Sequence, residues 1–276
     1  MATSITNAFI TQFEAEVHMA YQRMGSKLKN LTRTVNGVNG NTVKFQKVAK
    51  GSANTKARHA EVVAMDLAHS NVSATLTDYY AADYVDKLDE LKVNIDERQV
   101  VANSAAYALG RKTDSVITSV MENATQLANN SAGTSTGMNL EKAQAMMELF
   151  NTNDVPDDQQ RYWVVGPKQW SDLINLDQFS RVEYVGESEL PYAGGMTAKR
   201  WLGFLWFVHS GLETSGSTDR HTVAFHKSAI GMGIGSDVKT EVNYIPEKVS
   251  HLITSMLSIG GVLIDSDGIR IQKCAE

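Results

Sequence analysis

The strongest pattern of apolar and polar positions in the chain spans residues 96–124. Apolar side chains recur there at helical spacing, namely Val101, Ala105, Ala108, Leu109, Val116, Ile117, Val120, Met121 and Ala124. A single apolar stripe among polar positions predicts an amphipathic helix, about 40 Å long at about 1.5 Å per residue. Asn94 and Glu97 resemble a capping box at its start. Gly110 costs the helix about 1 kcal/mol, so tertiary packing has to hold its middle.

A second amphipathic pattern precedes it, in residues 3–24, where the apolar positions are Ile5, Phe9, Phe13, Val17 and Tyr21. Their spacing predicts a helix. The following residues, 25–40, are rich in Gly, Asn and basic side chains and are interpreted as a polar linker. The helix would pack on the protein's own core or, on such a tether, dock onto a neighbouring chain. The sequence favours neither alternative.

Residues 42–48 and 71–77 alternate between apolar and polar side chains, which predicts two strands. The long stretch between them carries no strong element of its own, and a connection of that length suggests a functional loop. An isolated hairpin is marginally stable in water. Its apolar face therefore needs a cover, supplied by its own domain or by an adjacent subunit.

Basic side chains follow the first limb and the tip of this hairpin, at Lys47, Lys50, Lys56 and Arg58. Such a row suits an acidic partner surface. The more usual interpretation of a lysine-rich loop is a solvated segment, and both remain open.

The remaining chain alternates between short helices and strands. A charged lead-in (83–95) precedes the long helix, and a Ser/Gly/Asn hinge follows it. The further predictions are a helix at 139–150, a buried strand at 161–165, a helix opened by Pro167, an irregular loop at 176–199, strands at 202–209 and 222–225, a long strand at 248–264, and a turn at 265–268 with a short return.

Composition adds limits to this picture. The 276 residues are 42% hydrophobic, which is enough for one large core or two modest ones. The net charge of −5 supplies no basic field for gripping nucleic acid, although it is compatible with enclosing DNA loosely. A single cysteine, Cys274, allows no intrachain disulfide and fits a reducing compartment. With neither a signal-peptide pattern nor a membrane-length apolar run, we expect a soluble intracellular protein.

Two glycine motifs invite catalytic or binding interpretations. Residues 133–137 (GTSTG) match a hydrolase nucleophile elbow with Ser135 as the nucleophile, but that chemistry needs a strand-to-helix turn and the preceding residues look like a frayed helix end. A flexible hinge is favoured. Residues 231–235 (GMGIG) lack the spacing and the following helix of a phosphate-binding loop, so a glycine-rich strand edge is expected.

The titratable side chains likewise form no convincing site. His221 and His226 would point to opposite faces of one strand, and His209 has no patterned partner. Asp265 and its neighbours lack the remaining ligands of a calcium loop and are interpreted as a turn. We therefore predict a protein that is not an enzyme, with no catalytic residues, cofactor or metal.

Three stretches, taken in order, carry a resemblance to a known family. They are VVGPKQWSDLI at 164–174, LGFLWFV at 202–208, and GVLI at 261–264 followed by Ile269 and Ile271. Together with the order of elements, they make the chain similar to the major capsid protein of tailed bacteriophages. That family has the Hong Kong phage-type fold, which is shared with encapsulins and herpesvirus shells. The resemblance covers nearly the whole chain and rests on the ordered set, since no single motif is highly specific.

The resemblance implies an α+β fold with a long spine helix, an extended β-hairpin loop and a mixed α/β axial domain. It divides the chain into an N-terminal arm (1–40), the extended loop (41–80), a peripheral domain with the spine helix (81–130), an axial domain (131–240), the long peripheral strand (241–264) and a C-terminal return (265–276). We expect Phe9, Phe13, Lys47, Lys50, Lys56 and Arg58 to contact neighbouring subunits.

The implied function is a structural shell protein, assembled as hexamers and pentamers into an icosahedral capsid around double-stranded DNA bound without sequence specificity. Its expected location is the virion, after assembly in the host cytoplasm. Its expected partners are itself, scaffolding, portal and decoration proteins, but no membrane. The alternatives are an encapsulin-like compartment, a hydrolase using Ser135, or a tail-tube protein, against which the long helix at 96–124 argues.

Overall fold

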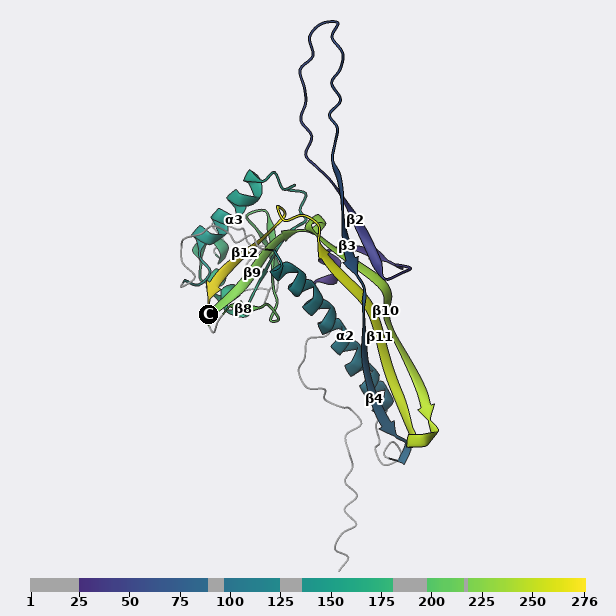
Figure 1. The fold of residues 1–276 in the computed structure, drawn as a ribbon. Coiled ribbons are helices and arrows are strands. Elements are labelled where there is room, and N and C mark those ends of the chain that lie inside the picture. The colour runs from purple at the N-terminus through teal and green to yellow at the C-terminus, as the bar shows by residue number, and fades with distance from the viewer. Residues whose placement is uncertain (1–24, 89–96, 125–135, 181–197, 216–217) are drawn as a thin grey trace, which may run out of the picture. The chain divides into compact units, whose positions relative to one another are not determined.

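The computed structural model describes residues 25–88, 97–124, 136–180, 198–215 and 218–276 (Figure 1). The predicted arm helix with Phe9 and Phe13, the cap at Asn94, and Ser135 lie outside the described residues.

The strands form three sheets. The first, of four strands, has the order β1 (Arg33–Asn36), β10 (Ile230–Ile245), β11 (Ser250–Leu263), β4 (Thr77–Asp86). The second, of six strands, has the order β12 (Ile269–Ala275), β9 (Asp219–His226), β5 (Arg161–Val165), β7 (Phe204–Val208), β6 (Ala198–Trp201), with β8 (Thr214–Ser215) also paired to β9. The third is the hairpin of β2 (Thr42–Val48) and β3 (His69–Thr75).

Four α-helices have described bounds: α2 (Glu97–Glu122), α3 (Leu140–Thr152), α4 (Pro167–Ile174) and α5 (Asp177–Ser180). Single 3-10 turns lie at η1 (Lys29–Leu31), η3 (Lys227–Ala229) and η4 (Pro246–Lys248). Asn139 caps α3 by accepting a hydrogen bond from the amide of Lys142, and Pro167 occupies the first turn of α4. Within the described residues, none of the helices combines the length and the apolar character needed to cross a membrane.

The chain divides into two compact units. The smaller consists of Met1–Gly25, Asp78–Arg111 and Asp237–Leu257, and the larger of Ser26–Thr77, Lys112–Ser236 and Ser258–Glu276. Helix α2 and strands β10 and β11 each contribute residues to both units. The domain boundaries proposed from the sequence stay a prediction.

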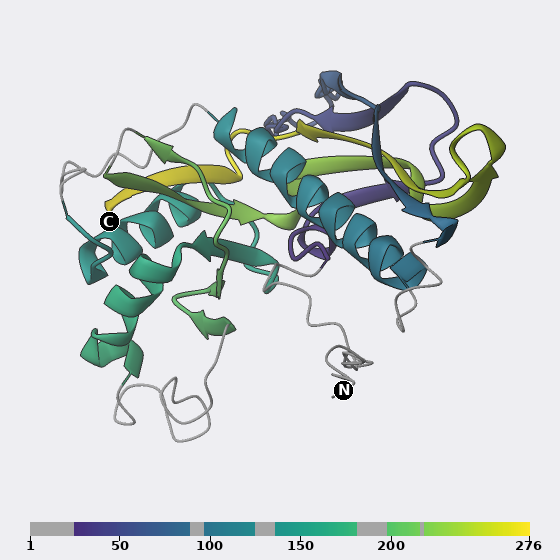
Figure 2. The ribbon, with the colours of Figure 1, turned by 90° about the horizontal axis from the view of Figure 1, so that it is seen from below.

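The core of the larger unit is aromatic. Trp163 of β5 stacks on Trp206 of β7 with ring centroids 4.1 Å apart, and both side chains are fully buried. Phe150 of α3 and Trp170 of α4 belong to the same cluster, so α3 and α4 cover one face of the six-stranded sheet (Figure 2). Burial of large aromatic side chains dominates the stability of such a core.

The root of the hairpin packs on glycine residues of β10. Phe45 and Ala74 are buried against Ile264. A Cβ added at Gly231 would lie 2.8 Å from the ring of Phe45, and a Cβ at Gly233 would lie 2.5 Å from Val43. The larger unit itself therefore covers the apolar face of the hairpin at its root. The sequence predicted a glycine-rich strand at the edge of a sheet for residues 231–235. The strand is confirmed, but its place at an edge is wrong, because β10 lies between β1 and β11 there.

Three other predictions need correction. The irregular loop predicted at 176–199 contains helix α5 and the start of β6 among its described residues. Residues 25–40 are not only a linker, because β1 pairs in parallel with Gly231–Ile234 of β10. The lead-in after the hairpin begins as strand β4, which lies next to β11. Both strands are defined by partners more than 150 residues away in sequence, so local periodicity gives little signal for them.

Candidate inter-subunit surface

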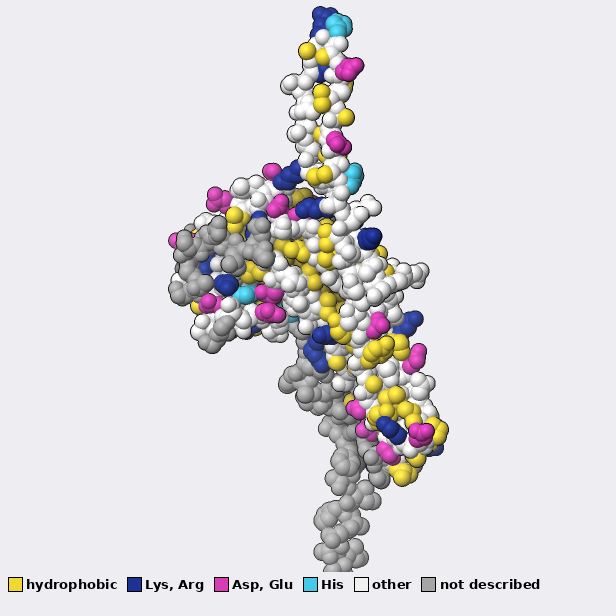
Figure 3. Space-filling view, viewed as in Figure 1, with side chains coloured by type: hydrophobic (Ala, Val, Ile, Leu, Met, Phe, Trp, Pro, Cys, Tyr) yellow, Lys and Arg dark blue, Asp and Glu magenta, His cyan; other side chains and the backbone are white. Residues whose placement is uncertain are grey.

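The connection between β2 and β3 is a long loop whose residues 49–68 are all exposed. It extends well beyond the two strands that carry it (Figure 1). Figure 3 shows Lys and Arg side chains at its outer end, next to a histidine, in the loop that contains Lys56, Arg58 and His59. The basic tip predicted from the sequence is therefore solvent-facing in a single chain.

The four predicted basic residues do not form one group. Lys56 and Arg58 lie at the tip, whereas Lys47 and Lys50 lie at the root of the loop. Lys47 Nζ is 2.8 Å from Asp265 Oδ1, and Lys50 Nζ is 3.5 Å from the carbonyl oxygen of Asn153. Lys47 therefore ties the hairpin to its own unit. Its predicted contact with a neighbouring subunit stays a prediction, as do those of the other three.

The second limb of the loop carries an apolar row that the sequence analysis did not single out. Val62, Val63, Met65 and Leu67 are 77%, 67%, 46% and 38% exposed. Met65 and Leu67 approach the first limb, because a Cβ at Gly51 would lie 2.7 Å from Met65 Sδ. The signal was available as the run VVAMDL at 62–67. Exposed apolar side chains that lie close together are candidates for an interaction surface. We call Val62, Val63, Met65 and Leu67 the apolar limb.

A buried carboxylate on α2 fixes the start of the larger unit. Asp114 is fully buried and accepts hydrogen bonds from Ser26 Oγ at 2.5 Å, from the amide of Leu28 at 3.1 Å and from the amide of Lys27. His209 Nε2 lies 3.2 Å from its second oxygen. Residues 26–28 are the first residues of the larger unit, so Asp114 ties the start of that unit to α2.

The hydrogen bonds around His209 assign its tautomer, and those around Asp114 lower the pKa of its carboxyl group. The Gly211 amide donates to His209 Nδ1, which leaves the proton on Nε2 to be donated to Asp114. Burial by itself would raise the pKa of Asp114. The hydrogen bonds from His209, Ser26 and the backbone amides outweigh burial and lower the pKa below its ordinary value of 3.8.

The two other histidines of the sequence analysis bind different carboxylates. His221 Nδ1 lies 2.6 Å from Glu122 Oε2, and His226 Nε2 lies 2.9 Å from Asp158 Oδ1. The part of the chain that the structure describes holds no cluster of three or more metal-ligating side chains. The amide of Asp267 donates to Asp265 Oδ1, which is the turn chemistry expected there.

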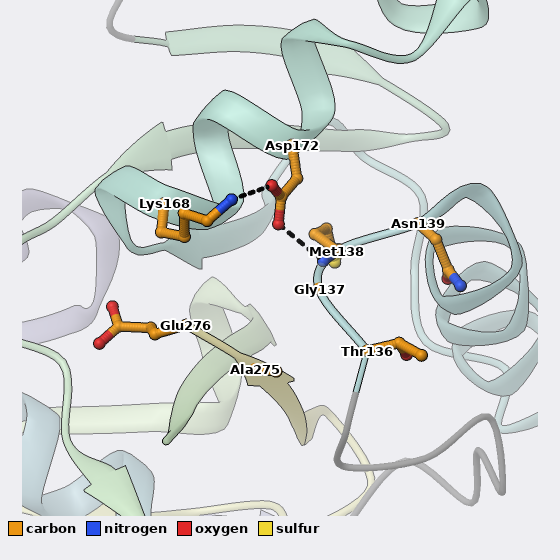
Figure 4. A pocket seen from close by; sticks show the side chains of 8 residues that line it. All are labelled: Thr136, Gly137, Met138, Asn139, Lys168, Asp172, Ala275 and Glu276. Carbon is orange, nitrogen blue, oxygen red and sulfur yellow. Dashed lines mark hydrogen bonds and ion pairs between the residues drawn. The ribbon is translucent and has the colours of Figure 1, made fainter. Parts of the chain in front are cut away.

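A pocket of about 320 Å³ lies between the starts of α3 and α4 and the end of β12 (Figure 4). Asp172 accepts from Lys168 Nζ at 2.8 Å and from the Met138 amide at 3.1 Å, so its oxygens are already engaged. Nearby, buried Cys274 has its pKa raised to about 11 by burial, which keeps the thiol protonated and unreactive at neutral pH. The described lining therefore offers no activated nucleophile.

The fold and the loop define a class of protein. The chain combines a long helix, an α/β unit and a hairpin whose root packs on glycines and whose loop carries exposed apolar side chains. The chain belongs to the phage capsid protein family, whose model matches residues 5–276.

Solved structures agree with this family. A structure from Mycobacterium phage Che8 is 18% identical, with 97% of this chain and 98% of that chain covered and a TM-score of 0.76. The capsid of cyanophage P-SCSP1u is 16% identical, with 96% and 92% covered and a TM-score of 0.75. The capsid of a native GTA particle is 13% identical, with 97% and 96% covered and a TM-score of 0.74. No curated protein matches the chain.

These comparisons confirm the predicted family and the α+β capsid fold. They also place the chain among structural shell proteins, which agrees with the predicted non-enzymatic role.

Proposed function

We propose that this chain is the major capsid protein of a tailed phage and that its copies assemble as hexamers and pentamers into an icosahedral shell around double-stranded DNA. Membership of the phage capsid protein family supports the proposal. The structural observation that carries it is the apolar limb, which lies on the second limb of a loop whose root is fixed to its own unit. The natural cover for such a limb is a neighbouring copy.

The size of the limb is sufficient to matter for assembly. Its four exposed fractions add up to slightly more than two fully exposed side chains. Complete burial of a Val, Leu or Met side chain contributes about 1.5–3 kcal/mol, so each loop can contribute about 3–7 kcal/mol to a contact. Fixing the loop and the partner opposes part of this gain. Many such contacts, repeated around a closed shell, make assembly cooperative.

The net charge of the chain bears on how the shell holds DNA. With a net charge of −5, the chain has no overall attraction for DNA, so we infer that the shell encloses DNA without binding it tightly. The family resemblance implies that the enclosed DNA is not selected by sequence. Scaffolding, portal and decoration proteins are the further partners that the family resemblance suggests. Assembly in the host cytoplasm, with the virion as the final location, completes the proposal.

The experiment replaces all four residues of the apolar limb with serine and expresses the full chain. We expect a folded protein by circular dichroism that forms few or no shells by electron microscopy and sedimentation. Deleting residues 50–68 should have the same effect. The matched control is Ser52→Ala with Asn54→Ala, which alters exposed positions on the first limb of the same loop but keeps the apolar limb. Normal shells from the four-serine chain would refute the role of the limb.

A second experiment, which analyses the contents of the shells, separates the proposal from an encapsulin-like compartment with the same fold. Shells of the unaltered chain, assembled in the presence of the phage genome, should contain double-stranded DNA. A protein cargo in place of DNA would favour the compartment.

A further inference from the structure

Strand β10 has an open edge in the smaller unit. Its first part pairs with β1 through Gly231–Ile234, and the amide of Val38 adds a last hydrogen bond to Ile234. Beyond that, within the described residues, β11 is the only strand beside residues 238–245 (Figure 1). These residues are exposed except for half-buried Ile245.

An open edge of this length is a template for another strand, because its outward N–H and C=O groups are left to solvent. The stretch 238–245 contains neither Pro nor Gly, so its backbone can support a regular ladder. Lysine on an edge commonly prevents such pairing. Here Glu241 lies two residues from Lys239 on the same face. In a suitable register, Lys239 of one strand can face Glu241 of the added strand, so the charges favour that register over others.

We propose that β10 pairs with β10 of a second copy across a two-fold axis, as antiparallel strands centred on Thr240. This contact joins neighbouring copies in the shell and is independent of the apolar limb. It rests on the proposed function only in that the two copies belong to one particle.

Symmetry restricts the registers that are available. A two-fold axis normal to the sheet keeps each side chain on its own face. Because side chains alternate between the two faces, an even-numbered residue opposes an even-numbered residue and an odd-numbered one opposes an odd-numbered one. The axis must therefore pass through one residue and its own copy. Centring on Lys239 places two lysines opposite each other, and centring on Glu241 places two glutamates opposite each other. Like charges in that position are destabilising.

Centring on Thr240 removes both conflicts. Lys239 then opposes Glu241 of the second copy, and the symmetry repeats this opposite-charge pair. Val238 opposes Val242 in the same way, and these two side chains are 37% and 49% exposed in the single chain. In this register the strand is therefore complementary to its own copy. Lys239 and Glu241 form opposite-charge pairs on one face, and Val238 and Val242 form apolar contacts on the other.

The faces can be assigned from the neighbouring strand. Thr240 Oγ1 lies 2.7 Å from Ser255 Oγ, so the side chains of Val238, Thr240 and Val242 lie on the face of β11 that bears Ser255. Lys239 and Glu241 lie on the opposite face. The two kinds of contact therefore do not compete for space.

Disulfide cross-linking tests the register. Cα atoms of directly opposed antiparallel residues lie about 4.5–5.5 Å apart, within the range that a disulfide spans. Thr240→Cys should form a covalent dimer under mild oxidation. Val238→Cys alone should not, since the two copies would be about 13 Å apart at about 3.3 Å per residue. A mixture of Val238→Cys and Val242→Cys chains should cross-link again. The native thiol at Cys274 is buried and adds little background.

A charge exchange in the Thr240→Cys background tests complementarity. Lys239→Glu alone and Glu241→Lys alone should each slow the cross-linking about three- to tenfold, because like charges then face each other. The double variant, with both substitutions, should restore the original rate. Equal rates in all four chains would overturn the proposed register.

Cross-linking is scored on denaturing gels and shells are scored by electron microscopy, so two failures remain distinguishable. Shells that form from Thr240→Cys chains without covalent dimers overturn this inference and leave the proposed function intact. Covalent dimers from a chain that forms no shells support the strand contact and count against the proposed function.

Discussion

Replacing Asp114 with alanine should strongly destabilise the larger unit. The change removes the acceptor of hydrogen bonds from Ser26, Lys27, Leu28 and His209. Of these donors, the Leu28 amide and the His209 ring are buried, and the cavity left by Asp114 is itself fully buried. A buried donor without a partner costs about 1–3 kcal/mol. We therefore expect the free energy of unfolding to fall by about 3–5 kcal/mol.

The measurement is urea-induced unfolding of the unassembled full-length chain, followed by circular dichroism. Asp114→Asn keeps the shape of the side chain and one acceptor oxygen, so its loss should be smaller than that of the alanine variant. Ser119→Ala, at an exposed position of the same helix, is the matched control and should change stability by less than about 0.5 kcal/mol. An alanine variant at position 114 as stable as this control would contradict the argument.

The same carboxylate makes stability depend on pH. Because the pKa of Asp114 is lower in the folded chain than its ordinary value of 3.8, its ionised form stabilises the fold above that pH. This contribution is lost as pH falls from about 3.8 through the folded pKa. Between pH 5 and pH 3, the stability difference between the unaltered chain and Asp114→Asn should therefore shrink. A constant difference over that range would show that the lowered pKa of Asp114 does not contribute to the stability of the fold.

Three further predictions concern other parts of the chain. Replacing Phe9 and Phe13 with serine should reduce the yield of shells seen by electron microscopy if the arm docks on a neighbour, and an unchanged yield would exclude that role. Gly260→Ala should cost about 1–3 kcal/mol in urea unfolding, because the added methyl meets the carbonyl of Thr75, and a neutral result would contradict the close approach. Cys274 should react with a thiol reagent at pH 8 only after unfolding, since its pKa is raised to about 11, and rapid reaction of the native chain would refute its burial.

The sequence was most informative where one pattern extended over many residues. The helix predicted at 96–124 is α2 at Glu97–Glu122, and the long strand predicted at 248–264 is β11 at Ser250–Leu263. Both bury a regular stripe, so the tertiary environment and the local pattern agree. The hairpin strands were placed within two residues of β2 and β3 for the same reason.

Strands β1 and β4 could not be found in this way. In β4 the acidic side chains of Asp78 and Asp83 interrupt the alternation, and the strand exists because β11 lies beside it. β1 spans Arg33–Asn36 and has no buried side chain, so its parallel pairing with β10 is a purely long-range contact. Such elements depend on the fold and leave little trace in local propensity.

The candidate surface shows the same division. The basic tip and the need for a cover were predicted from the hairpin sequence, whereas the apolar limb was overlooked although its residues are adjacent. The pairing of Asp114 with His209 joins positions 95 residues apart. No sequence spacing predicts such a contact. The sequence alone shows only that Asp114 is a polar residue on the apolar side of a helix.

The glycines beneath Val43 and Phe45 have a mechanical consequence for the loop. Because the hairpin root lies directly on backbone, with no side chains between, even a methyl group inserted at Gly231 or Gly233 would tilt the strands where they leave the unit. A long projection magnifies any tilt at its base, as a lever does, so a sub-ångström change there becomes a displacement of several times that size at the tip. The direction of the loop is therefore set by two glycines that lie beneath its root.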